Sequence, residues 1–483
     1  MRHKQEHFRI TKLKRTYNRQ TNTFTFNINY ETAAKALTPR TRTIAENFGL
    51  GTDSAQRFTL YDNIAIRIKP TDIVLITGDS GSGKSALLKA IKTDLGTTAQ
   101  DTKDLHINPD KPIIETLGKT TAEALQTLSK AGLNDAFLFL RTYAQLSDGQ
   151  KHRYQIARLT ETPAQWWILD EFCSTLDRDT ARIVAYNLQK LARAHGKAVI
   201  AATTHNDLLK DLAPNVHIHK RYGKQVTTHY RHTAPPTTCS LTREMHITQG
   251  TLTDYKQLSQ FHYRTNTCPA PRKIFTLKRK NETIGTIVYS HPPPTCFGRS
   301  KTWKGTIQQL QQQISTITRV VIHPKYRSIG LGAKLVHDTL TLAGTPHVET
   351  VAVMAKINPF FEHAGMKRIT ESKPSAAVTE ALQKLEQLDF DSALLASTNY
   401  SEHITNKIGC EAITSILSEL SKHDAAVRRR LAGLHNVYPK HEEFTAKIAG
   451  ANACEIAKML KRLSFLAQSK VYLFWSKDWQ NKT

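Results

Sequence analysis

The chain has 483 residues, of which 39% are hydrophobic, so it is long enough for three or four domains with ordinary cores. This apolar content excludes a wholly disordered chain. No stretch approaches the ~18 consecutive apolar residues of a membrane helix, and the amino terminus is polar and basic rather than signal-like. We therefore expect a soluble, cytoplasmic protein.

The charge balance is strongly positive, with 67 Lys and Arg against 41 Asp and Glu, a net charge of +26. A field of this sign attracts polyanions. We expect contact with nucleic acid, although a solvated basic surface would give the same composition. The six cysteines are scattered and form no C-x-x-C pair, which favours ordinary thiols over disulfides or a zinc site. Metal is therefore expected only together with nucleotide.

Residues 1–57 read as a basic N-terminal segment. Positions 2 to 19 hold seven Lys or Arg and one acidic residue, and the alternating stretch 21–30 predicts a strand. From residue 58 the pattern changes to strands that alternate with helices, which is typical of a layered α/β domain.

The apolar run Ile73–Thr77 predicts a buried strand that leads into a glycine-rich loop, G-x-x-x-x-G-K-S, and then into a helix. Glycines let backbone N–H groups converge on phosphate oxygens at a helix N-terminus, where the dipole favours anions. Lys84 would reach the β- and γ-phosphates, and the Ser85 hydroxyl would bind Mg²⁺. The expected ATP-binding residues are Gly78, Asp79, Ser80, Gly81, Ser82, Gly83, Lys84 and Ser85.

A second apolar strand, Trp166–Leu169, ends in two carboxylates, Asp170 and Glu171. Such a strand end can present one carboxylate to Mg²⁺ and the next to the attacking water. We therefore expect Asp170 and Ser85 to hold the Mg²⁺ that accompanies ATP.

Between these motifs, Leu146–Gln150 reads LSDGQ and resembles the LSGGQ signature of ABC ATPases, with Asp148 in place of the first glycine. Residues 174–177 follow at the place of that family's D-loop. A strand over 199–204 then ends at His205, the switch-histidine position. Residues 58–232 thus resemble an ABC-type ATPase domain.

The resemblance implies a homodimer through the ATPase domains, in which Ser147 and Gly149 of one protomer complete the ATP site of the other. It also implies that Glu171 is the general base and that His205 senses the γ-phosphate. The helical interval is shorter than in transporter members of the family, and Gln126 is only a weak Q-loop candidate. Phe58 and Tyr61 are candidates for stacking on adenine or for the core.

Residues 233–239 contain consecutive prolines and predict a linker. Within residues 240–372, positions 318–324 predict a strand, followed by R-x-x-G-x-G and a helix. This arrangement resembles the acetyl-CoA motif of the GNAT family. Its glycines would let backbone N–H groups approach a pyrophosphate. The expected acetyl-CoA-binding residues are Val320, Ile322, Arg327, Ile329, Gly330, Leu331, Gly332 and Ala333.

The rest of this region also resembles the GNAT family, with a predicted strand pair over 273–277 and 283–289 and a later segment over 359–366. The tyrosine that often protonates the leaving thiolate in that family is Phe361 here. A carboxylate, imidazole or phenolate can take the proton of an acceptor amine. The candidates for the base are Glu349, His262, Tyr263 and His323, with the first two preferred.

The expected fold class is α/β: a P-loop ABC ATPase domain and an α+β GNAT acyltransferase domain, with the basic N-terminal segment and a mostly helical C-terminal domain over 373–483. The layout resembles archaeal-type fusions of an ABC ATPase with a predicted acetyltransferase.

The expected cofactors are ATP, Mg²⁺ and acetyl-CoA. We expect an ATP-dependent acyltransferase that acts on nucleic acid, RNA in preference to DNA, with no membrane partner. The alternatives are a clamp on DNA or ribonucleoprotein whose acetyltransferase domain is regulatory or modifies protein lysines, and, third, a transporter subunit.

Overall fold

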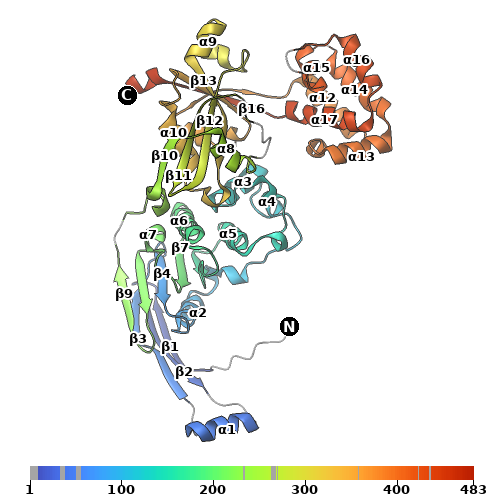
Figure 1. The fold of residues 1–483 in the computed structure, drawn as a ribbon. Helices are drawn as coiled ribbons and strands as arrows, with labels where there is room; N and C mark the ends of the chain where they lie inside the picture. The colour runs from blue at the N-terminus through green and yellow to red at the C-terminus, as the bar shows by residue number, and fades with distance from the viewer. Residues whose placement is uncertain are drawn as a thin grey trace. The chain divides into compact units, whose positions relative to one another are not determined.

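A computed structural model describes residues 9–32, 38–50, 56–231, 234–262, 268, 270–356, 358–422, 424–434 and 437–482. The chain forms two compact units, Met1–Val288 with Arg319–Asp338 and Tyr289–Thr318 with Thr339–Thr483. Figure 1 shows the elements in chain order. Strands β12 (Glu282–Ser290) and β13 (Ile314–Ile322) contain the boundaries between the units.

A six-stranded sheet organises the nucleotide-binding half of the first unit. Five strands run parallel and β9 is antiparallel to β8. The strands follow the order β5 (Ala99–Asp101), β6 (Trp166–Leu169), β7 (Ala198–Thr203), β4 (Ile73–Gly78), β8 (Val216–Lys220) and β9 (Val226–Tyr230). Since parallel strands end at the same edge of a sheet, the segments after β4, β6 and β7 meet there.

Both faces of the central strands β4, β6 and β7 are buried, which is why these strands are almost continuously apolar. Alternate residues point to opposite faces. Ile73 and Leu75 of β4 join the core formed with α5 (Asp148–Leu159) and α6 (Arg178–Ala194), whereas Val74 and Ile76 join the core formed with α2 (Lys84–Leu95).

The N-terminal segment belongs to this second core. Strand β2 (Thr23–Thr32) confirms the strand predicted over 21–30, and it pairs antiparallel with β1 (Arg9–Asn18) and β3 (Gln56–Arg67). Phe24 and Phe26 are fully buried together with residues of β4 and α2. Helix α1 (Pro39–Phe48) lies between β2 and β3 in the chain. Residues 9–32 therefore pack as part of the ATPase domain, whereas residues 1–8 lie outside the described residues.

A small helical layer follows the nucleotide loop in sequence. It contains α3 (Thr121–Lys130) and α4 (Ala136–Phe139), and it leads into α5. A 3-10 turn, Tyr143–Gln145, connects α4 to the signature segment. These elements share the core that includes α6.

A second sheet of seven strands contains the GNAT-like motif. Its order is β10 (Met245–Gln249), β11 (Pro271–Arg279), β12, β13, β14 (His347–Ala352), β16 (Lys470–Ser476) and β15 (Lys367–Ser372). The predicted strand pair around Asn281 is confirmed as β11 and β12. The motif helix is α10 (Leu331–Leu340), and the shorter helices are α8 (Leu252–Ser259), α9 (Ile307–Gln313) and α11 (Phe360–His363).

Six helices, inserted between β15 and β16, form a bundle around their own core. They are α12 (Ala376–Glu386), α13 (Thr398–Ile408), α14 (Cys410–Ser421), α15 (Ala425–Ala432), α16 (His441–Ala449) and α17 (Ala453–Leu466). Helix α15 is capped by Asp424, whose carboxylate accepts hydrogen bonds from the N–H groups of Ala426 and Val427.

The expected helical domain does not continue to the end of the chain. Strand β16 pairs antiparallel with both β14 and β15, and its residues from Val471 to Trp475 are buried. The physical reason is its composition, since the run Val-Tyr-Leu-Phe-Trp is rich in the aromatic and β-branched residues that fit a buried sheet. Residues 470–476 thus complete the sheet of the acetyltransferase-like region.

Candidate functional site

The glycine-rich loop has a backbone that only glycine allows at its first position. Gly78 has φ 146°, and a Cβ built there would lie 1.9 Å from the carbonyl oxygen of Lys220. Gly83, at the start of α2, has φ 101°. The amide groups from Gly81 to Ser85 therefore surround the N-terminus of α2, in the arrangement that binds phosphate.

The polar side chains of this loop fit a nucleotide phosphate and its metal. Lys84 Nζ donates to the carbonyls of Gly78 and Asp79 at 2.8 and 2.6 Å, so the ammonium lies inside the loop. Within the described part of the chain, the buried Ser82 Oγ has no hydrogen-bond partner. Ser85 Oγ donates to Asp170 Oδ1 at 3.1 Å, so the two expected metal ligands are adjacent. An orphaned hydroxyl beside paired oxygen ligands suits Mg²⁺-bound phosphate.

Lys103 is a further residue of this site, and the sequence analysis missed it. Its Nζ lies 2.9 Å from Asp170 Oδ2. Burial acts to lower the pKa of Lys103, but the hydrogen bond to Asp170 raises it overall. Strand β5 pairs in parallel with β6, which brings Asp101 opposite Ile168 and places Lys103 near the acidic strand end. A three-residue strand gives too short a pattern for sequence analysis to find. Gln126, the Q-loop candidate, is exposed on α3.

Glu171 and His205 lie at the same edge of the sheet, after the neighbouring strands β6 and β7. Glu171 is exposed and has φ 54°, a conformation that costs about 1–3 kcal/mol in a residue other than glycine. Its N–H donates to Asp170 Oδ1 at 3.0 Å. His205 is half-buried, and its N–H donates to Thr203 Oγ1 at 3.3 Å. Strained residues often occur at functional sites, which agrees with the role expected for Glu171.

The signature residues begin helix α5. Ser147 is the N-cap, and its N–H donates to Gln150 Oε1 at 3.0 Å in a capping box. A Cβ at Gly149 would lie 3.0 Å from the side chain of Leu176 in the D-loop, so the two segments are in contact. The participation of Ser147 and Gly149 in the ATP site of a second copy stays a prediction.

The two aromatic candidates for the adenine occupy different environments. Tyr61 is fully buried, and its hydroxyl donates to the carbonyl of Gly83 at 2.9 Å, so it supports the phosphate loop from the core. Phe58 is 50% exposed and is therefore the one of the pair that a base can reach.

The GNAT motif has the geometry of an anion-binding turn. Gly330 has φ 84° and is exposed, and a Cβ built there would meet no atom within 4 Å. The next residue begins α10, whose first N–H groups lack intrahelical partners. The described pairing of β13 with β14 covers Ile314–Thr316, before Val320 and Ile322. An open turn at a helix N-terminus beside a strand fits a pyrophosphate with its pantetheine arm.

The Arg327 side chain donates hydrogen bonds to backbone carbonyls around this turn. It donates from Nε to the carbonyl of Ile322 at 3.0 Å, from Nη1 to that of Asn134 at 2.9 Å, and from Nη2 to that of Phe261 at 3.2 Å. Burial lowers the pKa of the guanidinium. Three of the five N–H groups of Arg327 hold the turn in place, so the guanidinium positions the loop, and its expected contribution of charge to a bound ligand stays a prediction.

Glu349 is fully buried and bound on all sides, which corrects its assignment as a candidate base. Arg299 pairs with both of its oxygens, at 2.9 and 2.6 Å, and the hydroxyls of Thr316 and Tyr472 donate to it at 2.9 and 3.0 Å. A carboxylate with four donors in the core has no lone pair directed at a substrate. Its role in this structure is to join β14 to β16.

The remaining base candidates differ in their surroundings. His323 Nδ1 accepts from the N–H of Lys325 at 3.3 Å, and burial lowers the pKa of the imidazole. His262 is half-buried just after α8, and Tyr263 lies outside the described residues. Phe361 is buried in α11. The assignment of His262, the other preferred candidate, stays a prediction.

Within the described ranges, no helix is long and apolar enough to cross a membrane. Over the same ranges, no group of three or more His, Cys, Asp and Glu side chains is placed to hold a metal ion.

Comparison with known proteins finds similarity in each of the two motif-containing regions. The model of the acetyltransferase (GNAT) family matches residues 240–365. The chain is 30% identical over 160 residues to the zinc import ATP-binding protein ZnuC of Roseobacter denitrificans, which covers 29% of this chain and 62% of that protein. It is 26% identical over 184 residues to the cytochrome c biogenesis ATP-binding export protein CcmA of Vibrio parahaemolyticus, with 32% of this chain and 87% of that protein covered. The protein joins an ABC ATPase domain to a GNAT acetyltransferase domain.

The ABC ATPase–GNAT protein also matches solved ATP-binding cassettes. One is the cassette MJ0796 in a dimeric post-hydrolysis state bound to ADP and Pi, with 20% identity, a TM-score of 0.30, and coverage of 37% of this chain and 94% of that one. The chain spans less than two thirds of the length of both ZnuC relatives, 62% and 65%.

Proposed function

We propose that the ABC ATPase–GNAT protein hydrolyses ATP and transfers an acetyl group from acetyl-CoA to an acceptor amine. The observation that carries the first activity is the cluster formed by Lys84, Ser85 and Asp170, with the hydroxyl of Ser85 3.1 Å from the Asp170 carboxylate. The second activity is supported by the exposed Gly330 turn and by the GNAT match over 240–365.

In the ATPase reaction, Lys84 would leave the carbonyls of its own loop and bind phosphate oxygens. Mg²⁺, when bound by Ser85 and Asp170, supplies positive charge that stabilises the transferred phosphoryl group. Glu171 would orient the attacking water and accept its proton, and His205 would contact the γ-phosphate. Ser147 and Gly149 of a second copy would close the site, so we propose a homodimer that forms on ATP.

In the acetyl transfer, the N–H groups from Ile329 to Ala333 would hold the pyrophosphate. The acceptor amine attacks the thioester carbonyl, a C–N bond forms and the C–S bond breaks. His262 would take the amine proton, and the thiolate would gain a proton from solvent, because Phe361 has no hydroxyl to donate.

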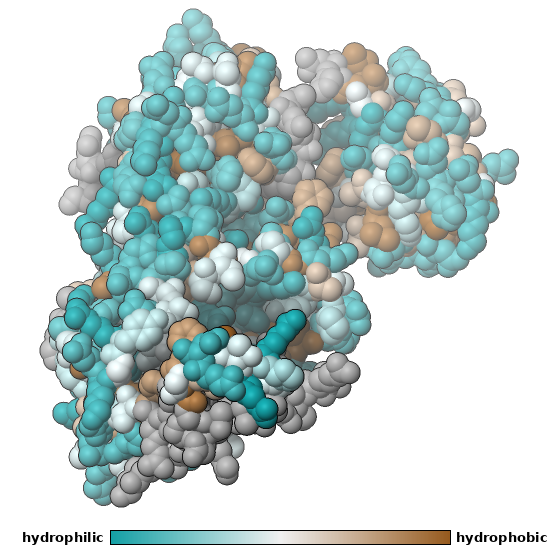
Figure 2. All heavy atoms as spheres, turned by 60° about the horizontal axis from the view of Figure 1, so that its bottom comes forward, coloured by the Kyte–Doolittle hydropathy of each residue, from teal (hydrophilic) through white to brown (hydrophobic). Residues whose placement is uncertain are grey.

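We propose a nucleic-acid acceptor, with RNA preferred, on the basis of the net charge of +26. The face shown in Figure 2 is mostly hydrophilic, with hydrophobic residues scattered over it. Some of the arginines bind within the protein. Arg279 pairs with Asp179, Arg428 donates to three backbone carbonyls, and Arg15 of β1 pairs with Asp94 at 3.0 Å.

The test is incubation of the protein with radiolabelled acetyl-CoA, with and without ATP, in the presence of RNA, DNA and protein fractions. We expect ATP-dependent label in RNA. Label only in protein would instead support the second candidate, a clamp with a lysine-directed acetyltransferase domain, which the missing hydroxyl at Phe361 also leaves open. Failure to bind acetyl-CoA or to hydrolyse ATP would contradict the proposal itself.

A further inference from the structure

The acetyl-CoA motif contacts the D-loop of the ATPase domain directly. Lys325, two residues before Arg327, lies 2.7 Å from Asp177 Oδ1 and 3.4 Å from Asp179 Oδ2. Asp177 ends the D-loop and is the N-cap of α6, where it accepts from the N–H of Thr180 at 3.2 Å. Movement of the D-loop would therefore act on Lys325, which is not among the residues assigned to bind acetyl-CoA and lies two positions before Arg327.

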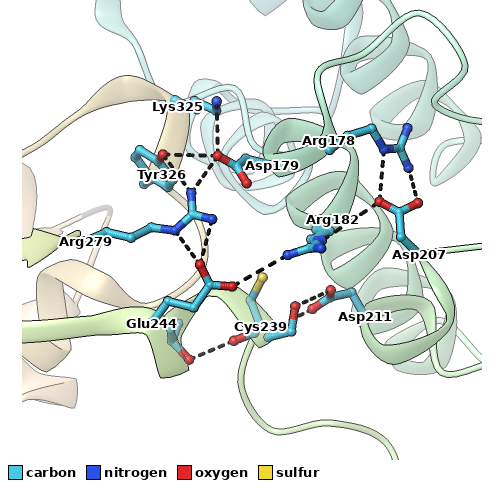
Figure 3. Close-up of polar contacts among 12 residues, drawn as sticks. Arg178, Asp179, Arg182, Asp207, Asp211, Cys239, Glu244, Arg279, Lys325 and Tyr326 are labelled. Atoms are coloured by element: carbon cyan, nitrogen blue, oxygen red, sulfur yellow. Dashed lines mark hydrogen bonds and ion pairs between the residues drawn. The ribbon is translucent and has the colours of Figure 1, made fainter. Parts of the chain in front are cut away.

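A more buried set of contacts links the start of α6 to the segment around Lys325. Arg279 of β11, whose side chain is 11% exposed, donates to Asp179 at 2.6 Å and pairs with Glu244 at 2.7 Å. Tyr326 donates to Asp179 at 3.4 Å (Figure 3). Partial burial would raise the pKa of Asp179, but Arg279 and Lys325 hold it below its usual value. We call Asp177, Asp179, Lys325 and Arg279 the D-loop latch.

The latch continues towards the switch histidine through alternating charges. Glu244 lies 3.7 Å from Arg182 of α6, and Arg182 lies 4.0 Å from Asp207. Arg178, in the first turn of α6, also binds Asp207, and Figure 3 shows this series of contacts. Asp207 is two residues after His205, the γ-phosphate sensor. The series thus starts beside the ATP site and ends at the acetyl-CoA turn.

A second contact holds the turn itself. Ser328 has φ 75°, which is strained for serine, and its Oγ accepts from Asn187 Nδ2 of α6 at 2.8 Å. Arg327 reaches the carbonyl of Asn134 on the other side. A strained residue persists only where its surroundings over-determine it. In this protein those surroundings include the ATPase domain.

We propose that the D-loop latch couples the two sites, so that binding of ATP changes the affinity of the Gly330 turn for acetyl-CoA. The inference rests on the proposed function, since it needs both ligands to bind. The latch has the parts of a switch: Arg279 is buried and fixes the contact, whereas Asp177 is 56% exposed and can part from Lys325 when the D-loop moves.

Thermodynamic linkage requires the coupling between the two sites to be equal in both directions. If ATP changes the dissociation constant for acetyl-CoA by a given factor, acetyl-CoA changes that for ATP by the same factor. We expect a factor of at least about fivefold, the lower end of typical allosteric coupling. Titration calorimetry would measure each Kd with Mg²⁺ and a non-hydrolysable ATP analogue, at fixed salt, with and without saturation of the other site.

The test variants remove one charge each. Lys325→Met should leave the Kd of each ligand alone within about twofold and bring the coupling factor close to one, because the link is lost rather than either site. Asp177→Asn should also bring the coupling factor close to one, since asparagine keeps the N-cap and removes the charge. Lys325→Arg keeps the charge and should restore coupling. The control is Lys384→Met in the bundle, because Lys384 also pairs with two carboxylates, Glu380 and Glu419, at 2.9 and 2.7 Å.

The outcomes separate the inference from the proposed function. If both ligands bind the wild-type protein but the coupling factor is one, the latch inference is wrong and the proposed function stands. A factor that survives in both Lys325→Met and Asp177→Asn also overturns the latch. If neither ligand binds, the proposed function fails and the latch with it. Melting curves show whether each variant is folded before its coupling is judged.

Discussion

At the scale of single residues, the proposed nucleotide site depends on which cation neutralises the carboxylate of Asp170. Ser85 and Lys103 each contact one of its oxygens, at 3.1 and 2.9 Å. The Lys103 ammonium lies where it can neutralise the carboxylate before metal arrives, and an ammonium and a divalent cation beside the same carboxylate repel each other. We therefore expect Lys103 to compete with Mg²⁺ for Asp170, a role that no sequence motif assigned.

We predict that Lys103→Met lowers the Mg²⁺ concentration needed for half-maximal ATP hydrolysis by about threefold to tenfold, since Mg²⁺ no longer displaces a cation. The measurement is ATPase rate against Mg²⁺ concentration at saturating ATP. Lys92→Met is the matched control, because Lys92 pairs with Asp101 at 3.3 Å and not with Asp170. An unchanged half-saturation point would remove the competition argument.

Glu349 is a second carboxylate whose charge is balanced by a neighbouring cation, here in the core. Its charge is balanced by Arg299, whose side chain is 7% exposed, so loss of the carboxylate leaves a buried guanidinium unpaired. We predict that Glu349→Ala lowers the free energy of unfolding of this domain by about 3–5 kcal/mol. Chemical denaturation measures the loss. Glu349→Ala should still transfer acetyl groups with an unshifted pH profile at low temperature, whereas loss of the acidic limb of that profile would restore Glu349 as the base.

At the scale of elements, two strand–loop–helix turns are the proposed binding sites of the two ligands. The loops after β4 and β13 each use a glycine with positive φ near a helix N-terminus, at Gly83 and Gly330. Their functions are separable by substitution, because each turn belongs to a different sheet.

We predict that Gly330→Glu abolishes acetyl-CoA binding, since it adds a negative charge and a side chain where the pyrophosphate approaches and imposes φ 84° on a residue with a Cβ. Equilibrium binding of acetyl-CoA is the readout. Lys84→Ala is the reciprocal control: it should reduce ATP hydrolysis by at least about 100-fold and leave acetyl-CoA binding in place. Acetyl-CoA binding by Gly330→Glu at wild-type affinity would place the ligand elsewhere.

At the scale of the whole molecule, the helical bundle interrupts a hairpin. Ser372 at the end of β15 pairs with Lys470 at the start of β16, so the two ends of the inserted residues 373–469 are cross-strand neighbours. A two-residue type I′ turn is the usual connection between such partners. The bundle has its own core and is therefore expected to be dispensable for the sheet.

We predict that replacement of residues 373–469 by Asn-Gly leaves acetyl-CoA binding within about threefold of wild type, because this turn matches the twist of the strands it joins. Truncation after residue 469 is the control, since it removes β16, whose residues from Val471 to Trp475 are buried. That truncated protein should lose acetyl-CoA binding and keep ATP binding. If the Asn-Gly variant loses acetyl-CoA binding while remaining folded, the bundle contributes to the site itself.

The sequence alone determined the features that depend on near neighbours. A strand, a glycine loop and a helix follow one another within a few residues, so the Gly78 and Gly330 turns and the strand end at Asp170 were predicted correctly as structure. Both domains were identified for the same reason, because their motifs are local and ordered along the chain. The hairpin around Asn281 likewise depends on adjacent residues.

Only the tertiary structure decided the contacts between residues far apart in the chain. Glu349 is matched with Arg299 and Tyr472, 50 and 123 positions away, and this turned a candidate base into a core residue. Asp177 meets Lys325 across two domains. Sequence spacing does not predict such pairs, because the same charged residue can face solvent, a substrate or an ionic partner. Burial in the folded chain distinguishes these cases.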